Sequence, residues 1–190
     1  MEQRAIHLGF AEIIAETQRF INQNWVKVGF LNLITAFARL AQEGGFGPIA
    51  TPLFTSLELL VILARLGLLV LVLGQGTWQA GFQQIAAFPK LISSEWGIRW
   101  KQLGINVFWN KIALSINLIV MMVVGTLTNL SVQLLTHTFL LKWLKNKQWV
   151  AAQTTPWGVT QFLENLSITP FTEVFTVLLV LFLFRKSAQQ

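Results

Sequence analysis

The chain has 190 residues, of which 54% are hydrophobic and only 12% are charged, and its mean hydropathy is +0.58. A soluble domain carries about 25% charged residues, so this composition excludes an ordinary water-facing surface and indicates one all-α domain, a polytopic helical bundle integral to a membrane. Lys and Arg (14) exceed Asp and Glu (8), but they lie mostly at the ends of apolar runs, which argues against a nucleic-acid partner.

The first predicted element is an amphipathic interfacial helix within residues 1–24. Apolar residues recur near one side of residues 3–23, while Glu12, Glu16 and Arg19 lie elsewhere, as is typical of a helix on a membrane surface. The N-terminal sequence lacks the continuous apolar region and the cleavage site of a signal peptide. The mature chain is therefore expected to start at or near Met1.

Residues 25–42 are the most ambiguous apolar segment. Their uncharged core from Val28 to Ala38 is short for a bilayer, but Lys27 and Arg39 can snorkel and so extend it. Without this crossing the basic residues divide almost evenly between the two sides of the membrane. The positive-inside rule therefore favours four spans with both termini cytoplasmic. The four predicted spans are residues 25–42, 53–74, 112–135 and 168–184.

The strongest predicted span covers residues 53–74. A hydrocarbon core of about 30 Å needs about 20 mostly apolar residues, and this segment carries only two charges, Glu58 and Arg65. Its Leu, Ile, Val and Phe residues outweigh the insertion cost of those two charges. The Gly- and Pro-rich sequence at 44–52 predicts a short hairpin before it, and Thr51-Pro52 predicts the start of the helix.

Residues 75–111 are predicted to form interfacial helices between two spans. Basic side chains are mixed with Trp96, Trp100 and Trp109 in the second half of this segment. Such a mixture of basic and aromatic residues suits an anionic headgroup layer. The sequence therefore predicts that membrane lipid headgroups contact three cations: Arg99, Lys101 and Lys111.

The C-terminal half of the chain contains two further predicted spans. Residues 112–135 carry no charge and predict the second strong span. The stretch at 142–167 is polar and contains tryptophan, which favours an interfacial loop. Thr169-Pro170 then predicts the start of the last span at 168–184, which ends at Arg185-Lys186.

Five polar residues within the spans are predicted to form a buried cluster. Arg65 lies near the middle of its span, where a lone guanidinium costs about 2.5–3.5 kcal/mol, so it is expected to face protein or water. Glu58 is on the same helical face, but about 10.5 Å away along the axis, so a bridging group is expected between them. The predicted cluster contains Glu58, Arg65, Asn129, Gln133 and Glu173. Fixing the packing of the helices is the simpler role for it, and lining a ligand site is the functional one.

Motifs for chemistry are missing from the sequence. It contains no GxSxG, P-loop, GxGxxG or HExxH pattern, and its two histidines, His7 and His137, have no metal-ligand neighbours. The lack of cysteine excludes disulfides, thiolate metal sites and a cysteine nucleophile. We therefore predict no catalytic residue, no metal and no cofactor.

These features favour a non-enzymatic function. The leading interpretation is an accessory, assembly or scaffold subunit of a larger membrane complex, in contact with lipid and with a membrane-protein partner. The alternative is a small transporter or channel component, with Glu58, Arg65 and Glu173 on the path. A third hypothesis, an enzyme acting on lipid near His137, has the least support.

Overall fold

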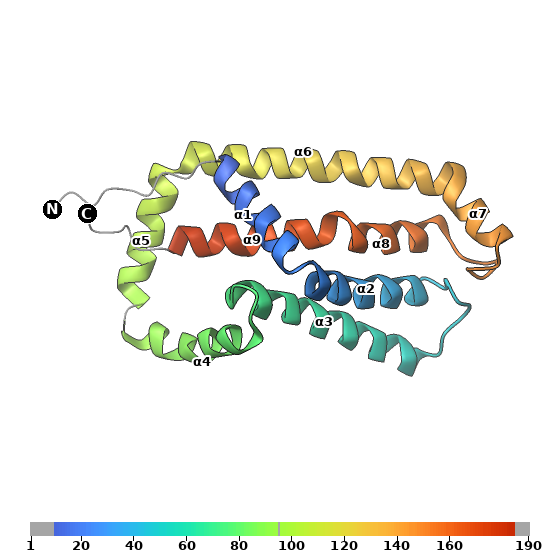
Figure 1. The fold of residues 1–190 in the computed structure, drawn as a ribbon, viewed down its shortest axis with the longest axis horizontal. Helices are drawn as coiled ribbons and strands as arrows, with labels where there is room; N and C mark the ends of the chain where they lie inside the picture. The colour runs from blue at the N-terminus through green and yellow to red at the C-terminus, as the bar shows by residue number, and fades with distance from the viewer. Residues whose placement is uncertain (1–9, 95, 185–190) are drawn as a thin grey trace. The chain divides into compact units, whose positions relative to one another are not determined.

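The computed structural model describes residues 10–94 and 96–184, and these residues form helices and connecting turns with no strand (Figure 1). The predicted all-helical class is therefore confirmed for the described chain. The helices are α1 (Phe10–Gln23), α2 (Trp25–Gln42), α3 (Thr51–Leu73), α4 (Trp78–Ser94), α5 (Trp96–Trp109), α6 (Lys111–Leu135), the π-helical turn η1 (Thr136–Leu140), α7 (Leu141–Asn146), α8 (Pro156–Leu166) and α9 (Ile168–Phe184).

Two or three of these elements have the length and composition of membrane spans. The first is α3, and the second is the continuous 36-residue run from Lys111 to Asn146 that comprises α6, η1 and α7. The pair α8 and α9 qualifies as a third only if both helices, bent by 45° at their junction, form one span. Among the described helices, α2 is not a candidate by this measure. Four spans and membrane insertion therefore stay predictions.

Several helices occupy the predicted ranges. The bounds of α2 and α9 are those predicted, α6 starts one residue early, and α3 starts at the Thr51-Pro52 pair. The predicted interfacial helices at 75–111 correspond to α4 and α5. In the N-terminal segment, α1 starts at Phe10, and residues 3–9 of the predicted helix lie outside the described residues, as do Arg185 and Lys186.

The region 142–167, expected to be a loop, contains most of α7 and all of α8. The start of α8 is encoded locally: Thr155 is its N-cap, Pro156 occupies the first turn, and the Gly158 N–H donates to the Thr155 hydroxyl at 3.2 Å. Val159, Phe162, Leu163 and Leu166 then recur at helical spacing. The tryptophans and polar residues of this region concealed that periodicity.

The chain divides into two compact units, and α3, α6 and α9 contribute residues to both. The first unit comprises Met1–Asn24, Leu69–Met122 and Glu173–Gln190, and the second unit comprises Trp25–Leu68 and Val123–Thr172. In the first unit, the Asn106 amide donates to the Leu183 carbonyl at 2.8 Å, which joins α5 to the end of α9. The end of α3 also meets α4 closely, because a Cβ at Gly81 would collide with the Val70 carbonyl oxygen.

In the second unit, α2 packs against α8. The rings of Phe37 and Phe162 meet edge to face, with centroids 5.1 Å apart. Leu40 forms a core with Val150 and Val159, and this core extends to the end of the long helix, where Leu140, Leu141 and Leu144 pack against it. The turn after α2 is fixed to the segment before α8, since the Ala151 N–H donates to the Gly45 carbonyl at 2.8 Å.

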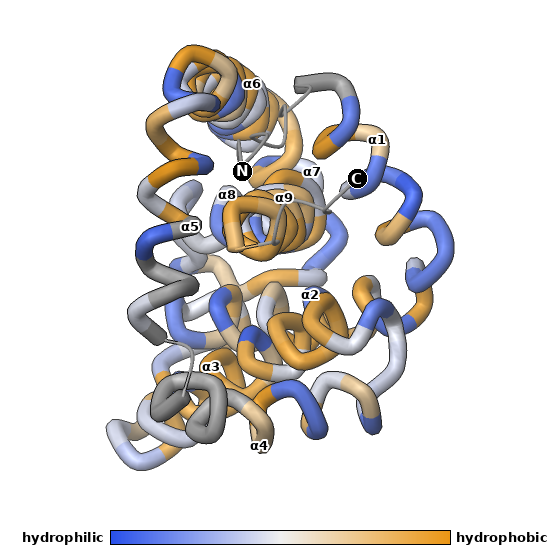
Figure 2. Tube along the Cα trace, turned by 90° about the vertical axis from the view of Figure 1, so that its left-hand side faces the viewer, coloured by the Kyte–Doolittle hydropathy of each residue, from blue (hydrophilic) through white to orange (hydrophobic). Residues whose placement is uncertain are grey.

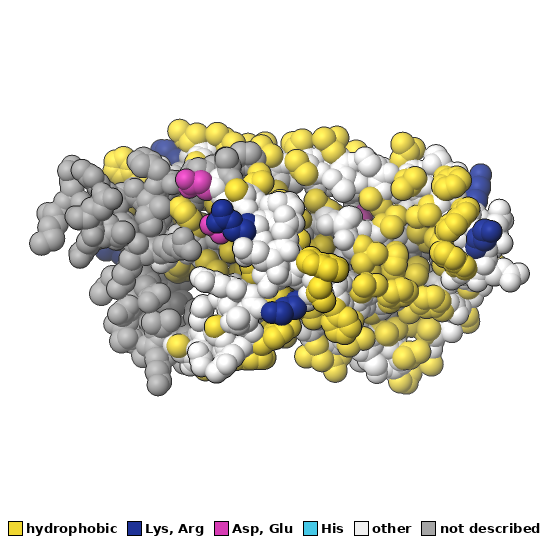
Figure 3. Space-filling view, in the orientation of Figure 1, with side chains coloured by type: hydrophobic (Ala, Val, Ile, Leu, Met, Phe, Trp, Pro, Cys, Tyr) yellow, Lys and Arg dark blue, Asp and Glu magenta, His cyan; other side chains and the backbone are white. Residues whose placement is uncertain are grey.

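The surface of the described residues is rich in hydrophobic side chains (Figure 3). More large hydrophobic side chains are exposed than buried among them, and many of the exposed ones lie on α3 and α6. The trace of α9 and much of α6 is correspondingly hydrophobic in Figure 2. Buried positions, in contrast, include polar residues such as Asn32, Asn117, Thr160 and Glu164. This distribution suits apolar surroundings better than water.

Candidate functional site

Many polar side chains in the long helices are satisfied by their own helix. The Asn32 amide donates to the Val28 carbonyl at 2.8 Å, and the Thr35 hydroxyl donates to the Leu31 carbonyl at 3.1 Å. Such bonds to the preceding turn let a helix carry polar residues where water is absent. Two networks in the second unit differ from this pattern because they join different helices, and they are the candidate sites.

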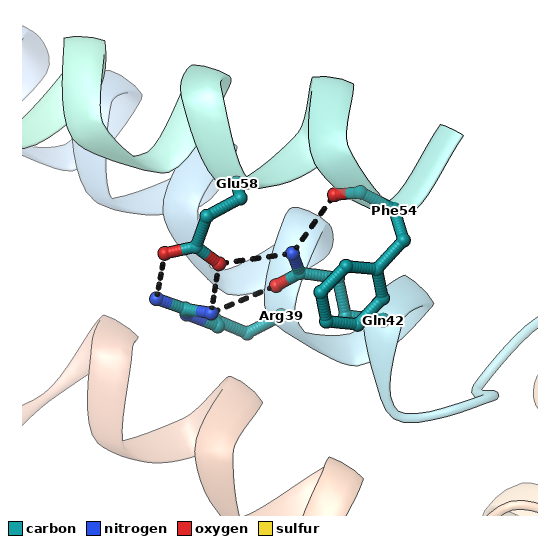
Figure 4. A network of polar contacts seen from close by, with 4 residues as sticks. All are labelled: Arg39, Gln42, Phe54 and Glu58. Carbon is teal, nitrogen blue, oxygen red and sulfur yellow. Dashed lines mark hydrogen bonds and ion pairs between the residues drawn. The ribbon is translucent and has the colours of Figure 1, made fainter. Parts of the chain in front are cut away.

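The first network joins α2 to α3 through an ion pair (Figure 4). Two guanidinium nitrogens of Arg39 donate to the two carboxylate oxygens of Glu58, at 2.6 and 3.0 Å. Gln42 completes the network: its amide nitrogen donates to Glu58 at 3.1 Å and to the Phe54 carbonyl at 3.2 Å, and its amide oxygen accepts from Arg39 at 2.9 Å. This bidentate geometry makes the hairpin of α2 and α3 locally neutral.

The second network joins α6 to α8 and contains a carboxylate with no basic partner. Gln133 donates through its amide nitrogen to the Asn129 amide oxygen at 2.6 Å, and the Asn129 amide nitrogen donates to the Glu164 carboxylate. The Glu164 residue is only 9% exposed. Glu164 takes part in neither the ion pair of Arg19 with Glu16 nor that of Arg39 with Glu58. The hydrogen-bond donor to its carboxyl group is therefore an amide and not a cation.

The structure distributes the five predicted cluster residues over several places. Asn129 and Gln133 are hydrogen-bonded together, and Glu58 bonds to Arg39 and Gln42 on α2. Arg65 is exposed on α3, where it interacts electrostatically with Glu58. Glu173 is half-buried in α9 and belongs to the first unit, so a cluster that joins it to Glu58 stays a prediction.

Two residues of these networks were not predicted as site residues: Arg39 and Glu164. The sequence predicts for Arg39 only the role of a membrane anchor, although the short turn between α2 and α3 is a signal that the end of one helix faces the start of the next. The signal for Glu164 is its spacing from Thr160, since two polar residues four apart share one face of a helix. That signal could be used only after α8 had been recognised as a helix.

The three cations predicted to contact lipid headgroups lie in or directly after α5. Lys101 and Lys111 are exposed, and the Lys111 ammonium lies 5.0 Å from the centroid of the Phe108 ring. The side chain of Arg99 lies outside the described residues. The exposed pair of Lys111 and Phe108 has the charged and apolar character of an interfacial anchor, and its contact with lipid stays a prediction.

A cavity of about 700 Å³ lies within the first unit, and α1 and α9 form much of its wall. Glu12, Glu16 and Arg19 line one part of it, and Leu181 and Phe182 line another.

In the described part of the chain, no three His, Asp or Glu side chains are grouped so that they could hold a metal ion. Comparison with protein-family models, with curated proteins and with solved structures gives no match.

Proposed function

We propose that this protein is an integral membrane protein that acts as an accessory, assembly or scaffold subunit of a larger membrane complex. The proposed topology has four spans, at α2, α3, α6 and α9, with both termini cytoplasmic. Insertion is supported by the exposed apolar side chains of α3 and α6, because a surface of this kind is matched to lipid and to other membrane helices. The neutral pair of Arg39 and Glu58 supports insertion of α2 together with α3.

The observation that carries the accessory role is the exposed face of α3 around Arg65. Arg65 is exposed near the middle of this 23-residue helix, and Ile62 and Leu66 beside it are 46% and 50% exposed. A guanidinium at this depth costs about 2.5–3.5 kcal/mol against lipid. A face that combines it with apolar side chains is better matched to a protein. We expect the partner to be a transmembrane helix with a carboxylate at the depth of Arg65.

The test is to extract the protein from its own membrane in mild detergent and to measure whether it is monomeric or part of a complex. We expect a stable complex of fixed stoichiometry, and a photoreactive residue at Ile62, on the same face of α3 as Arg65, should crosslink to a partner helix next to an acidic residue. Arg65→Ala should lower the yield of this complex by about tenfold, equivalent to about 1.4 kcal/mol. Arg19→Ala, which changes an exposed arginine of α1, is the matched control. A monomer without partner in every mild detergent would contradict the proposal.

The topology has a separate test. Single cysteines introduced at the exposed Phe46, in the turn between α2 and α3, and at the exposed Gln148, after α7, are expected to react with an impermeant maleimide from the side opposite the termini. Because the sequence contains no native cysteine, the maleimide can react only with the introduced one. Labelling of Phe46→Cys from the side of the termini would show that α2 does not cross.

A small transporter or channel component is the second candidate function. It is favoured by the polar seam between α6 and α8, which consists of Asn129, Gln133 and Glu164. Buried polar and ionisable residues within membrane helices commonly mark a substrate or ion path. The purified protein in liposomes would then conduct ions or exchange a solute, and Glu164→Gln would abolish that flux. Sealed proteoliposomes that show no flux would leave the accessory role as the function.

A further inference from the structure

Glu164 occupies an unusual position for a carboxylate. It lies two residues before the end of α8, and α8 bends by 45° into α9 at this end. Its side chain faces α6, where Asn129 donates to it. Interrupted helices of this kind place polar groups inside membrane proteins, and their broken ends often form binding sites for small ions.

The neighbourhood of Glu164 is a polar seam rather than an isolated bond. On α6 and η1, Asn129, Gln133 and Thr136 share one face at spacings of four and three residues, and Thr136 is fully buried with no hydrogen-bond partner for its hydroxyl oxygen. On α8, Thr160 lies one turn before Glu164 and is 1% exposed. Several polar side chains of α6, η1 and α8 therefore gather around Glu164, and one of them has an oxygen atom without a hydrogen-bond partner.

Charged groups on the packed elements do not neutralise Glu164. The elements against α8 are α2 with its following turn, η1, α6 through Asn129, and α7, whose Leu141 and Leu144 pack against the core that contains Val159. Arg39 is bound to Glu58, Lys27, His137 and Lys142 are exposed, and Lys145 is half-buried; Glu164 forms an ion pair with none of these residues. Glu43 is half-buried beside Gly158, six residues before Glu164 and so about 9 Å away along the helix. It also adds negative charge, so any neutralising charge must come from a bound ion.

We propose that Glu164, with Asn129 and Gln133, forms a binding site for one monovalent cation, a proton or an alkali-metal ion, in the seam between α6 and α8. A buried carboxylate without a counter-charge is strongly disfavoured, and either ion removes that charge. The carboxylate and amide oxygens are the hard ligands that alkali and alkaline-earth ions prefer. This site is independent of the accessory role, and its test needs no partner protein.

The test uses dicyclohexylcarbodiimide, an apolar reagent that reacts with protonated carboxyl groups in apolar surroundings. The full-length protein in detergent is treated from acid to neutral pH, with and without sodium or potassium chloride, and the modified residue is identified by peptide mass spectrometry. We expect label on Glu164 and about tenfold less on Glu58, because the bidentate bond to Arg39 keeps Glu58 ionised. Glu58 is thus an internal control within the same molecule.

The two ions give different results. If the ion is a metal, sodium or potassium chloride at constant ionic strength will protect Glu164 from the reagent, and choline chloride will not. If the ion is a proton, label will fall as the pH rises and will not depend on the salt. Glu164→Gln should remove this label and leave the remaining pattern unchanged.

Two outcomes overturn the proposal. In the first, Glu164 is unlabelled at every pH in the folded protein and yet reacts after denaturation at acid pH. Equal labelling of Glu164 and Glu58 would also overturn it, since the difference between a lone and a paired carboxylate is its basis. Both results are measured on the protein without substitutions, so they do not depend on whether a variant folds.

Discussion

The two networks of the second unit each contain one glutamate, but the carboxyl groups of these two residues have different partners. Glu58 is paired with Arg39 and bonded to Gln42, at a site where the side chains of the pair are 25% (Arg39) and 39% (Glu58) exposed. Glu164 is more deeply buried and has only an amide donor, Asn129. The first arrangement joins a carboxylate to a cation and fixes a helical hairpin, whereas in the second the carboxyl group has an amide donor and no cation beside it. This difference separates a structural element from a candidate binding site.

The largest effect is expected when the ion pair is broken from its basic side. Arg39→Ala leaves the Glu58 carboxylate without its counter-charge, and we expect a loss of about 3 kcal/mol in the free energy of unfolding. Denaturation in mixed micelles, followed by the fluorescence of the eight tryptophans, measures this loss. The double variant Arg39→Leu, Glu58→Leu should recover most of it. A cost equal to that of the single variant would show that the loss does not come from the uncompensated Glu58 carboxylate.

A smaller effect is expected when the lone carboxylate loses its donor. Asn129→Leu removes the amide that bonds to Glu164 and is expected to cost about 2 kcal/mol. The same substitution in a Glu164→Leu background should cost much less, because no polar atom is then left without a partner. Additive costs in this double-mutant cycle, again measured in mixed micelles, would show that the two side chains are not coupled.

The two carboxylates should respond differently to neutralisation. Glu58→Gln weakens two charge-assisted bonds to Arg39 and is expected to cost about 1–2 kcal/mol. Glu164→Gln keeps an oxygen that can accept from Asn129 and removes the buried charge, so a change below about 0.5 kcal/mol is expected. Thermal unfolding of both variants in the same detergent makes the comparison. A greater loss for Glu164→Gln would reverse the assignment of roles.

Within the network of Arg39 and Glu58, the smallest effect is expected at Gln42. Gln42→Ala removes its bonds to Glu58 and to the Phe54 carbonyl, but it leaves the bidentate bond from Arg39 in place. We expect a loss of about 0.5–1 kcal/mol in the same unfolding assay. A loss as large as that of Arg39→Ala would show that the amide, and not the ion pair, holds the hairpin together.

The sequence predicted the helices better than it predicted their contacts. The bounds of α2, α3, α6 and α9 follow from apolar runs between Gly, Pro and charged residues, which are local signals. The partner of Glu58 depends on how two helices pack across a turn, and no local pattern records that geometry. The sequence therefore predicts an anchor at Arg39 and not an ion pair. It does not predict Glu164 as a site residue, because α8, with its Trp and Thr residues, does not have the uniform hydrophobicity of the spans.

The π-helical turn η1 has a consequence for how the long helix tolerates change in length. A π turn accommodates one residue more than an α-helical turn while the flanking helices keep their directions. Deletion of one residue there, such as the exposed Thr138, should let the turn close as ordinary α-helix and leave Leu141 and Leu144 against their core. The same deletion at Leu127 would rotate everything beyond it by about 100°. The deletion of one residue should therefore be accepted at η1 and rejected elsewhere in this helix.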